Sequence, residues 1–222
     1  MGSRFINFGV FMFKRKIISL LLASGLALST SAIASSNSWW NDVKNDRANS
    51  VTQAIEQGQD PNVFNPDGNP AIIQAVREDS IRVFKALAEN PKTDVNIVSQ
   101  SGETPLMYAA IMGDLETAKI LVNRGAQVNR LGWAPLHYAA VKGHTKMVEY
   151  LLAQGAFPNA PAAEGSSPIL LAVSSKNMDT VKALLKAGAD PRAINQQQMN
   201  AVQLAQKMKL SSIEKLLHQA LK

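Results

Sequence analysis

The chain has 222 residues, of which 46% are hydrophobic and 18% are charged, a composition typical of folded rather than disordered proteins. It has no cysteine, which excludes disulfides, thiol catalysis and a lipid anchor attached through cysteine. The net charge of +6 does not indicate nucleic-acid binding, because Arg4, Lys14, Arg15 and Lys16 precede every acidic residue and account for all but +2 of it.

The first 34 residues have the pattern of a secretory signal peptide. Three consecutive basic residues precede an apolar run at 17–28, and Ala32 and Ala34 supply the small side chains that a signal peptidase requires. A membrane-spanning anchor is the alternative, but it needs about 20 apolar residues, and serine, threonine and glycine interrupt this stretch. We therefore predict a signal peptide at 1–34, with Met12 as an alternative start, and a mature chain exported to the periplasm or beyond the cell.

From residue 38 onward the sequence repeats itself. A proline or alanine marks the same position in five copies, with spacings of 34, 30, 33 and 33 residues. The first and the last of these five are degenerate, and another half-recognisable copy precedes them. The boundaries predicted for the six repeats lie near 38–66, 67–100, 101–131, 132–163, 164–196 and 197–222.

Each copy predicts two short helices joined by a turn. In the third copy, Thr104 is placed to cap the first helix and Pro105 occupies its first turn, where a missing N–H has no cost. Gly113 suits the left-handed conformation that ends this helix, and a second helix follows. A helix pair of this length cannot bury its own apolar face, so we expect the pairs to stack around one core. Trp39 and Trp40 are expected to close that core at the N-terminal end.

These copies resemble the ankyrin repeat, whose family pattern is roughly G-x-T-P-L-H-x-A-A, then G-H, then V-x-x-L-L-x-x-G-A-D-x-N. The third and fourth copies match it best, through Thr104-Pro105-Leu106 and Pro135-Leu136-His137, and the resemblance extends over about residues 38–220. It implies an all-α solenoid of about six stacked helix-turn-helix units with short hairpin-like tips. It also implies that residues 35–222 form a protein-binding domain, here in an exported bacterial protein, with no catalytic role and no cofactor.

Two histidines, His137 and His144, are the main candidates for chemistry. In the family, a histidine at the position of His137 bonds locally and supports the turn, and His144 falls at the start of the second helix, as a cap or a packing residue. The third and fifth copies replace both histidines, and no third ligand lies at a spacing suited to a metal. The sequence has no motif of a serine hydrolase, a phosphate-binding loop or a zinc protease. We predict no catalytic residue and no metal site.

The surface remains for binding a partner. Carried over by position, the resemblance assigns partner contacts to the tips and to the exposed face of the first helices: Arg77, Gln100, Glu103, Ile111, Met112, Arg130, Leu131, Trp133, Val141 and Lys142. Four of these residues (Ile111, Met112, Trp133 and Val141) are apolar where most copies are polar, and two basic residues flank them. The alternative is that these apolar side chains are half-buried between repeats.

The spacing of only 30 residues between Pro105 and Pro135 predicts a blunted tip before Trp133. A recess for a partner loop and simple tolerance of deletions at a tip are both open interpretations.

We expect a non-enzymatic scaffold that binds a partner protein in the periplasm. The mature chain should be a monomer that neither binds nucleic acid nor inserts stably into a membrane after cleavage. The alternative is a secreted, host-directed effector that uses the same repeats to bind a host protein. An enzyme with a site at His137 or His144 is a third hypothesis.

Overall fold

The computed structural model describes residues 38–162 and 164–222. The predicted signal peptide and its cleavage site lie outside these residues. A helical segment at 38–44 begins the described chain. It is followed by α2 (Ala48–Glu56), α3 (Ala71–Arg77), α4 (Ile81–Glu89), α5 (Pro105–Met112), α6 (Leu115–Asn123), α7 (Pro135–Lys142), α8 (Thr145–Ala153), α9 (Pro168–Ser174), α10 (Met178–Lys186), α11 (Ala201–Lys207) and α12 (Ser211–Ala220).

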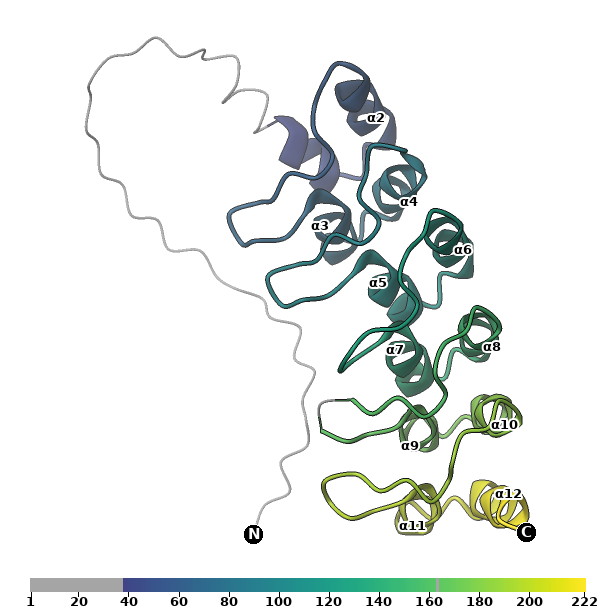
Figure 1. Ribbon diagram of the computed structural model, residues 1–222. Helices are drawn as coiled ribbons and strands as arrows, with labels where there is room; N and C mark the ends of the chain where they lie inside the picture. Colours follow the sequence, from purple (N-terminus) through teal and green to yellow (C-terminus); the bar gives the residue numbers. More distant parts are fainter. Residues whose placement is uncertain (1–37, 163) are drawn as a thin grey trace, which may run out of the picture.

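The helices form pairs that stack in single file (Figure 1). Segment 38–44 with α2, and then α3 with α4 through α11 with α12, make six pairs within the described residues. First helices contact first helices and second helices contact second helices, so the stack has two layers. The loops that join one pair to the next project from the first-helix layer as tips, and the stack curves toward their side. The prediction of an all-α solenoid of about six units is confirmed.

The helix ends follow the signals in the sequence. Pro105 begins α5, and the Thr104 hydroxyl accepts a hydrogen bond from the Met107 amide. Gly113 and Gly143 end α5 and α7 with φ of 72° and 69°. A Cβ at Gly113 would lie 2.9 Å from the His144 ring of the next repeat, so close stacking also requires glycine at this turn.

One core runs through the stack. Alanines on the first helices, such as Ala109 and Ala139, are fully buried, and their small size lets neighbouring first helices approach closely. Leucines of the second helices, such as Leu121 and Leu151, are also fully buried and fill the space between the two layers.

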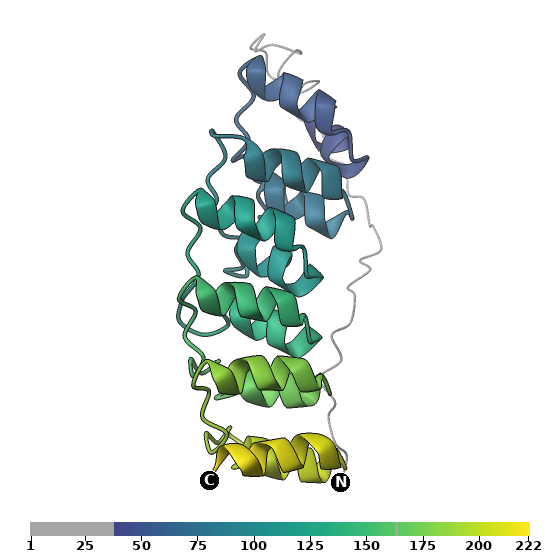
Figure 2. The ribbon, with the colours of Figure 1, turned by 90° about the vertical axis from the view of Figure 1, so that its right-hand side faces the viewer.

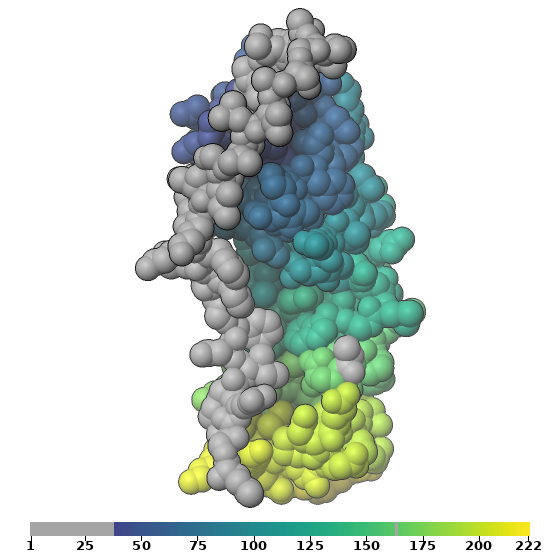
Figure 3. Space-filling view, turned by 90° about the vertical axis from the view of Figure 1, so that its left-hand side faces the viewer, coloured from purple at the N-terminus to yellow at the C-terminus, as the bar shows by residue number. Residues whose placement is uncertain are grey.

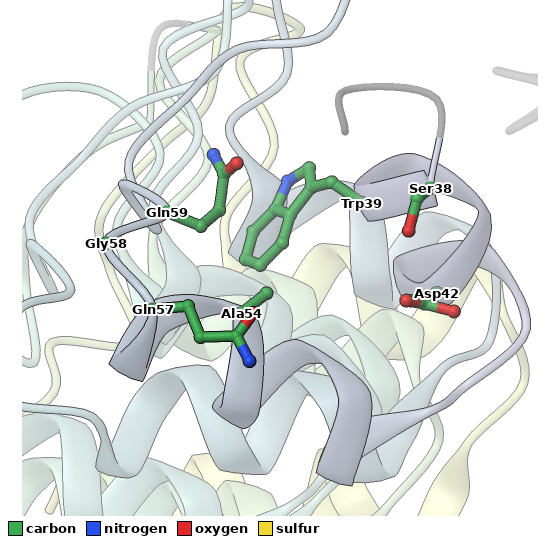
Figure 4. Close-up of a pocket in the computed structure, with 7 residues that line it drawn as sticks. All are labelled: Ser38, Trp39, Asp42, Ala54, Gln57, Gly58 and Gln59. Carbon is green, nitrogen blue, oxygen red and sulfur yellow. The ribbon is translucent and has the colours of Figure 1, made fainter. Parts of the chain in front are cut away.

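Trp39 closes the core at the N-terminal end, as expected. It is only 3% exposed, and its indole lies beside Ala54 and Gln59 (Figure 4). A shallow cavity of about 370 Å³ borders it on this end of the molecule. The Trp39 indole N–H has no hydrogen-bond partner among the described residues.

Asparagine side chains connect each tip to the next repeat. The Nδ2 groups of Asn62, Asn96, Asn129 and Asn159 donate to a backbone carbonyl in the turn after the next second helix, at 2.8–3.0 Å. Their Oδ1 atoms accept from the backbone amide two residues further on, at 2.7–2.9 Å. These four side chains form an asparagine ladder through the described residues, and it fixes the offset of each repeat on its neighbour. Arg192 occupies the same position in the last described tip.

His137 joins its own turn to the loop that leads to the following repeat. Its ring is fully buried, Nδ1 accepts from the Ala134 amide at 3.1 Å, and Nε2 lies 2.8 Å from the Ala160 carbonyl. Because a backbone amide can only donate, the proton of the neutral ring is on Nε2. Burial lowers the pKa of His137, which keeps the ring neutral. The predicted supporting role of His137 is confirmed.

His144 connects two repeats instead of capping its own helix. It stands at the N-cap position of α8 but makes no side-chain capping bond, so of the two expected roles the cap is wrong, whereas its ring does pack against Gly113 of the preceding repeat. Its Nε2 lies 3.0 Å from the Ile111 carbonyl at the end of α5. The equivalent Asn177 caps α10 and also donates to the Gly143 carbonyl at 2.9 Å. A polar side chain at this position therefore binds the end of the preceding first helix.

Replacing Asn129 by alanine removes a rung from the middle of the asparagine ladder. We expect the free energy of unfolding to fall by about 1–2 kcal/mol, because two hydrogen bonds of about 0.5–1.5 kcal/mol each are lost. Urea unfolding followed by circular dichroism measures this change. Asn123→Ala, in an exposed position of α6, is the matched control and should lose no stability. An equal loss in both variants would contradict the role of the rung.

The buried ring of His137 predicts a pH dependence of stability. Its pKa is lower in the folded protein than the ordinary value of 6.5, so the unfolded chain binds the proton more strongly. The stabilisation is complete above about pH 6.5 and is lost as the pH falls toward the folded-state pKa. The midpoint of thermal unfolding should therefore decrease between about pH 7 and pH 5, and this decrease should be smaller in His137→Asn. His218→Gln, on the exposed face of α12, should keep the full decrease, and an unchanged slope in His137→Asn would show that another group is responsible.

Candidate partner-binding face

The predicted contact residues lie on the tips and on the first helices, which share one side of the stack (Figures 1 and 3). A first group lies at the second and third repeats and contains Arg77, Gln100 and Glu103. A second group lies at the third and fourth repeats and contains Ile111, Met112, Arg130, Leu131, Trp133, Val141 and Lys142.

A polar network joins Arg77, at the end of α3, to the tip of the next repeat. Arg77 Nε donates to the Tyr108 hydroxyl at 3.0 Å, and Nη2 donates to Glu103 Oε2 at 3.1 Å. The Tyr108 hydroxyl donates to the same carboxylate oxygen at 2.8 Å. The guanidinium carbon also lies 5.9 Å from the centre of the Tyr108 ring. Side chains of two repeats are thus held in one arrangement at the surface.

Tyr108 keeps its proton in this network at neutral pH. Burial raises the pKa of Tyr108 to about 12, and its hydrogen bond to the Glu103 carboxylate acts in the same direction. The phenol therefore remains a hydrogen-bond donor at neutral pH. The side chains of Arg77 and Glu103 are 42% and 27% exposed, so their ion pair contributes little to stability, and its main effect is to orient both groups.

Gln100 connects two tips. Its backbone amide donates to the Gly68 carbonyl of the preceding tip at 3.0 Å, and its side chain covers Gly68 so closely that a Cβ there would lie 3.1 Å from Gln100 Cβ. The side chain of Gln100 is otherwise exposed. It is placed for contact with a partner at the outer end of the second and third tips.

Trp133 is a half-buried link between the fourth and fifth repeats. Its Nε1 donates to Glu164 Oε2 of the next tip at 3.1 Å, and its ring centre lies 5.1 Å from Tyr138 and 5.7 Å from His137. Met112 and Val141 are also partly buried and pack against the core, and Ile111 is partly buried. These positions match the alternative interpretation, in which the apolar side chains are half-buried between repeats. Their role in binding a partner stays a prediction.

Leu131 is the most exposed member of the second group. Its exposed fraction is 99%, whereas Arg130 is partly buried and Lys142 is exposed. A leucine with almost no contact to its own chain contributes nothing to the core. Its apolar surface is available to a partner.

The tip before Trp133 is blunted, as the repeat spacing predicts. The other four tips are closed by backbone hydrogen bonds that run from Asn65 to Asn69, Ser99 to Glu103, Ala162 to Ser166 and Asn195 to Met199. No such bond closes residues 128–133 among the described residues. The loop before α7 also projects less far than the loops on either side of it (Figure 1). Leu131 and the edge of Trp133 are therefore next to a gap in the row of tips.

Several surface residues were missed by the sequence prediction. Phe64, Val98 and Ile194 are 54%, 41% and 52% exposed and, like Leu131, stand two residues after the ladder position. The sequence does contain a signal for them, because an apolar residue recurs at this position in successive copies. Tyr108, which organises the Arg77 network, was also missed, because its role depends on partners in two repeats.

The geometry offers little for catalysis at the histidines. Both ring nitrogens of His137 are used in structural contacts within the core. In the described part of the chain no three histidine, aspartate or glutamate side chains converge as a metal site requires. None of the described helices has the length and apolar character needed to cross a membrane.

A family model for ankyrin repeats (three copies) matches residues 41–131, 72–162 and 125–195. The E3 ubiquitin-protein ligase KEG of Arabidopsis thaliana is 32% identical over 134 residues, which are 59% of this chain and 6% of that protein. The ankyrin repeat and SAM domain-containing protein 6 of Rattus norvegicus is 34% identical over 61 residues, which are 28% of this chain and 7% of that protein. The chain thus spans less than a tenth of the length of these two relatives.

A solved structure gives the same result for the fold. The crystal structure of an ankyrin repeat domain from Acinetobacter baumannii AYE, at 1.00 Å resolution, is similar with a TM-score of 0.70 and 26% sequence identity. The similarity covers 81% of this chain and 95% of that one. Because the family model matches well over half of the sequence and the repeat geometry agrees with it, the chain belongs to the ankyrin-repeat family.

Proposed function

We propose that this protein is a non-enzymatic scaffold, exported to the periplasm, that binds a partner protein through its tips and the exposed face of its first helices. Ankyrin repeats indicate a protein–protein interaction scaffold, and the family match supports this general role. The signal-peptide pattern at 1–34 supports the location. The proposed mature form is a monomer that neither binds nucleic acid nor inserts into a membrane.

Leu131 is the observation that carries the choice of the binding face. It is 99% exposed at the blunted tip, next to Trp133, whose indole is fixed by Glu164. Burying a leucine side chain in an interface contributes about 1.5–3 kcal/mol, which is the size of a hot-spot contribution. Trp133 and Arg77 are already held in place before a partner arrives, so their ordering costs little on binding.

The ligase activity of the Arabidopsis relative is not part of this proposal. The matched segment covers only 6% of that protein, and a shared fold does not transfer an activity. The same tip surface also suits a secreted effector that binds a host protein. The periplasmic scaffold and the secreted effector would bind a protein through the same surface, and they differ only in where they act.

Leu131→Asp tests the binding face. Crosslinking and pull-down of the tagged protein from periplasm should recover the partner with the wild type, and recovery should fall at least about tenfold with the variant, because the lost apolar burial corresponds to more than 1.4 kcal/mol. Phe157→Asp is the matched control, since Phe157 is 63% exposed in the turn directly after α8, outside the hydrogen-bonded end of its tip at 162–166. The control should recover the partner normally. Equal recovery by Leu131→Asp and the wild type would refute the proposed face.

Cell fractionation tests the location. The processed chain should be found mainly in the periplasmic fraction, with a mass that corresponds to a start at Ser35. Recovery mainly from the culture medium or from host cytosol would support the effector alternative. Recovery of the unprocessed chain from the membrane fraction would refute the predicted cleavage.

A further inference from the structure

Charge is distributed unevenly along the stack. Residues 38–131 contain nine lysines and arginines and twelve acidic residues, a net charge of −3. Residues 132–222 contain ten lysines and arginines and five acidic residues, a net charge of +5. The two halves of the solenoid therefore differ in sign, although the whole described chain is close to neutral.

The turns between the two helices of each pair follow this change of sign. They line up along one edge of the stack, on the right-hand side of Figure 2. The position with left-handed backbone is aspartate in the first two turns (Asp46 and Asp79), glycine in the next two, and lysine in the last two (Lys176 and Lys209). Lys142 lies directly before the glycine of the fourth turn. We call Lys142, Lys176 and Lys209 the lysine edge.

Of the two aspartates of this edge, Asp46 is paired within the protein, whereas Asp79 forms no ion pair with any residue that the structure describes. Asp46 accepts hydrogen bonds from Arg82 Nε at 2.7 Å and from the Val83 amide at 2.9 Å, so its charge is already paired within the protein. The three lysines of the lysine edge form no ion pair with any residue that the structure describes. The positive N-terminal ends of α8, α10 and α12 begin at the same edge and add to its potential.

Lysine is an unexpected residue for the backbone of these turns. Lys176 and Lys209 have φ of 59° and 57°, a region that favours glycine. The two middle turns use glycine, which shows that the turn itself needs no side chain. Two long basic side chains in an unfavourable backbone conformation suggest that the charge itself is useful.

A groove lies between the last two turns. It has a volume of about 410 Å³, with Lys176 and Lys209 beside it and Met178, Leu210 and Ile213 among its lining residues. It therefore offers an apolar surface between two unpaired positive charges. A partner that fits it combines carboxylates with an apolar side chain.

We infer that the lysine edge is a second docking surface, which binds an acidic polypeptide segment. Carboxylates of the segment lie over successive lysines, and an apolar side chain enters the groove between Lys176 and Lys209. Packed helices lie about 8–10 Å apart, and an extended polyproline-type chain advances about 9 Å in three residues, so an acidic residue at every third position matches the repeat spacing. The edge has lysines and no arginine, and so lacks the forked donors that favour phosphate groups. Except for Lys142, none of these residues belongs to the tip surface of the proposed function.

A labelled peptide with glutamate at every third position (EAPELPEAPE) tests the inference, and its glutamine counterpart is the control ligand. Fluorescence anisotropy with the full-length protein should show binding of the acidic peptide that weakens strongly between about 20 and about 300 mM salt. The glutamine peptide should bind at least about tenfold more weakly. The triple variant Lys142→Gln, Lys176→Gln, Lys209→Gln should lose affinity at least about tenfold.

Two further variants separate docking from total charge and from folding. The matched control Lys119→Gln, Lys186→Gln, Lys222→Gln removes three exposed charges away from the edge and should bind within about twofold of the wild type. Lys176→Gly with Lys209→Gly should lose affinity without a lower midpoint of thermal unfolding, because glycine suits these turns.

Three results would overturn the inference: equal affinity of the edge variant and the wild type, equal losses in both triple variants, or binding of anionic vesicles without binding of the peptide. The tip variant Leu131→Asp should bind the acidic peptide normally. This outcome separates a failure at the edge from a failure of the proposed function.

Discussion

A short helix pair can bury only part of its apolar surface, so each repeat of this protein is stable only against its neighbours. Apolar packing alone tolerates small shifts between layers, because alanine and leucine contacts have little direction. The asparagine ladder supplies that direction. Each carboxamide has both a donor and an acceptor, and both are satisfied only when the next turn is at one offset. The core, the tips and the turn edge all depend on this offset.

The same offset brings surface groups from different repeats together. Arg77 and Glu103 are 26 residues apart and meet around Tyr108. Trp133 and Glu164 are 31 residues apart and meet between two tips. The Arg77–Glu103 ion pair is partly exposed and adds little to stability, and the Trp133–Glu164 hydrogen bond is part-buried. Their effect is to present charged and aromatic groups in a fixed pattern, which lowers the ordering cost of binding.

Most of the fold was predictable from the sequence because its signals are local. Pro105, Thr104 and Gly113 mark the ends of α5 within ten residues of one another, and the repeat spacing predicted the blunted tip. The site was less predictable, because its geometry depends on the next repeat. Trp133 is half-buried through Glu164, and His144 binds the Ile111 carbonyl 33 residues away instead of capping its helix. Leu131 is 99% exposed in the tip that lacks the closing backbone bond, whereas the equivalent Phe64, Val98 and Ile194 are 41–54% exposed in closed tips.

A stack built from equivalent contacts has a hazard that closed folds do not share. A further unit that continues the contacts at an end can add to it without limit, and the product is a filament. Arg192 stands where a further asparagine would extend the ladder. Its guanidinium can donate to a carbonyl but has no atom that accepts from an amide, so it can complete only half of a rung. Arg192 therefore cannot complete a rung to the turn after α12, and the last described pair lacks the fixed offset on which an added unit would have to build.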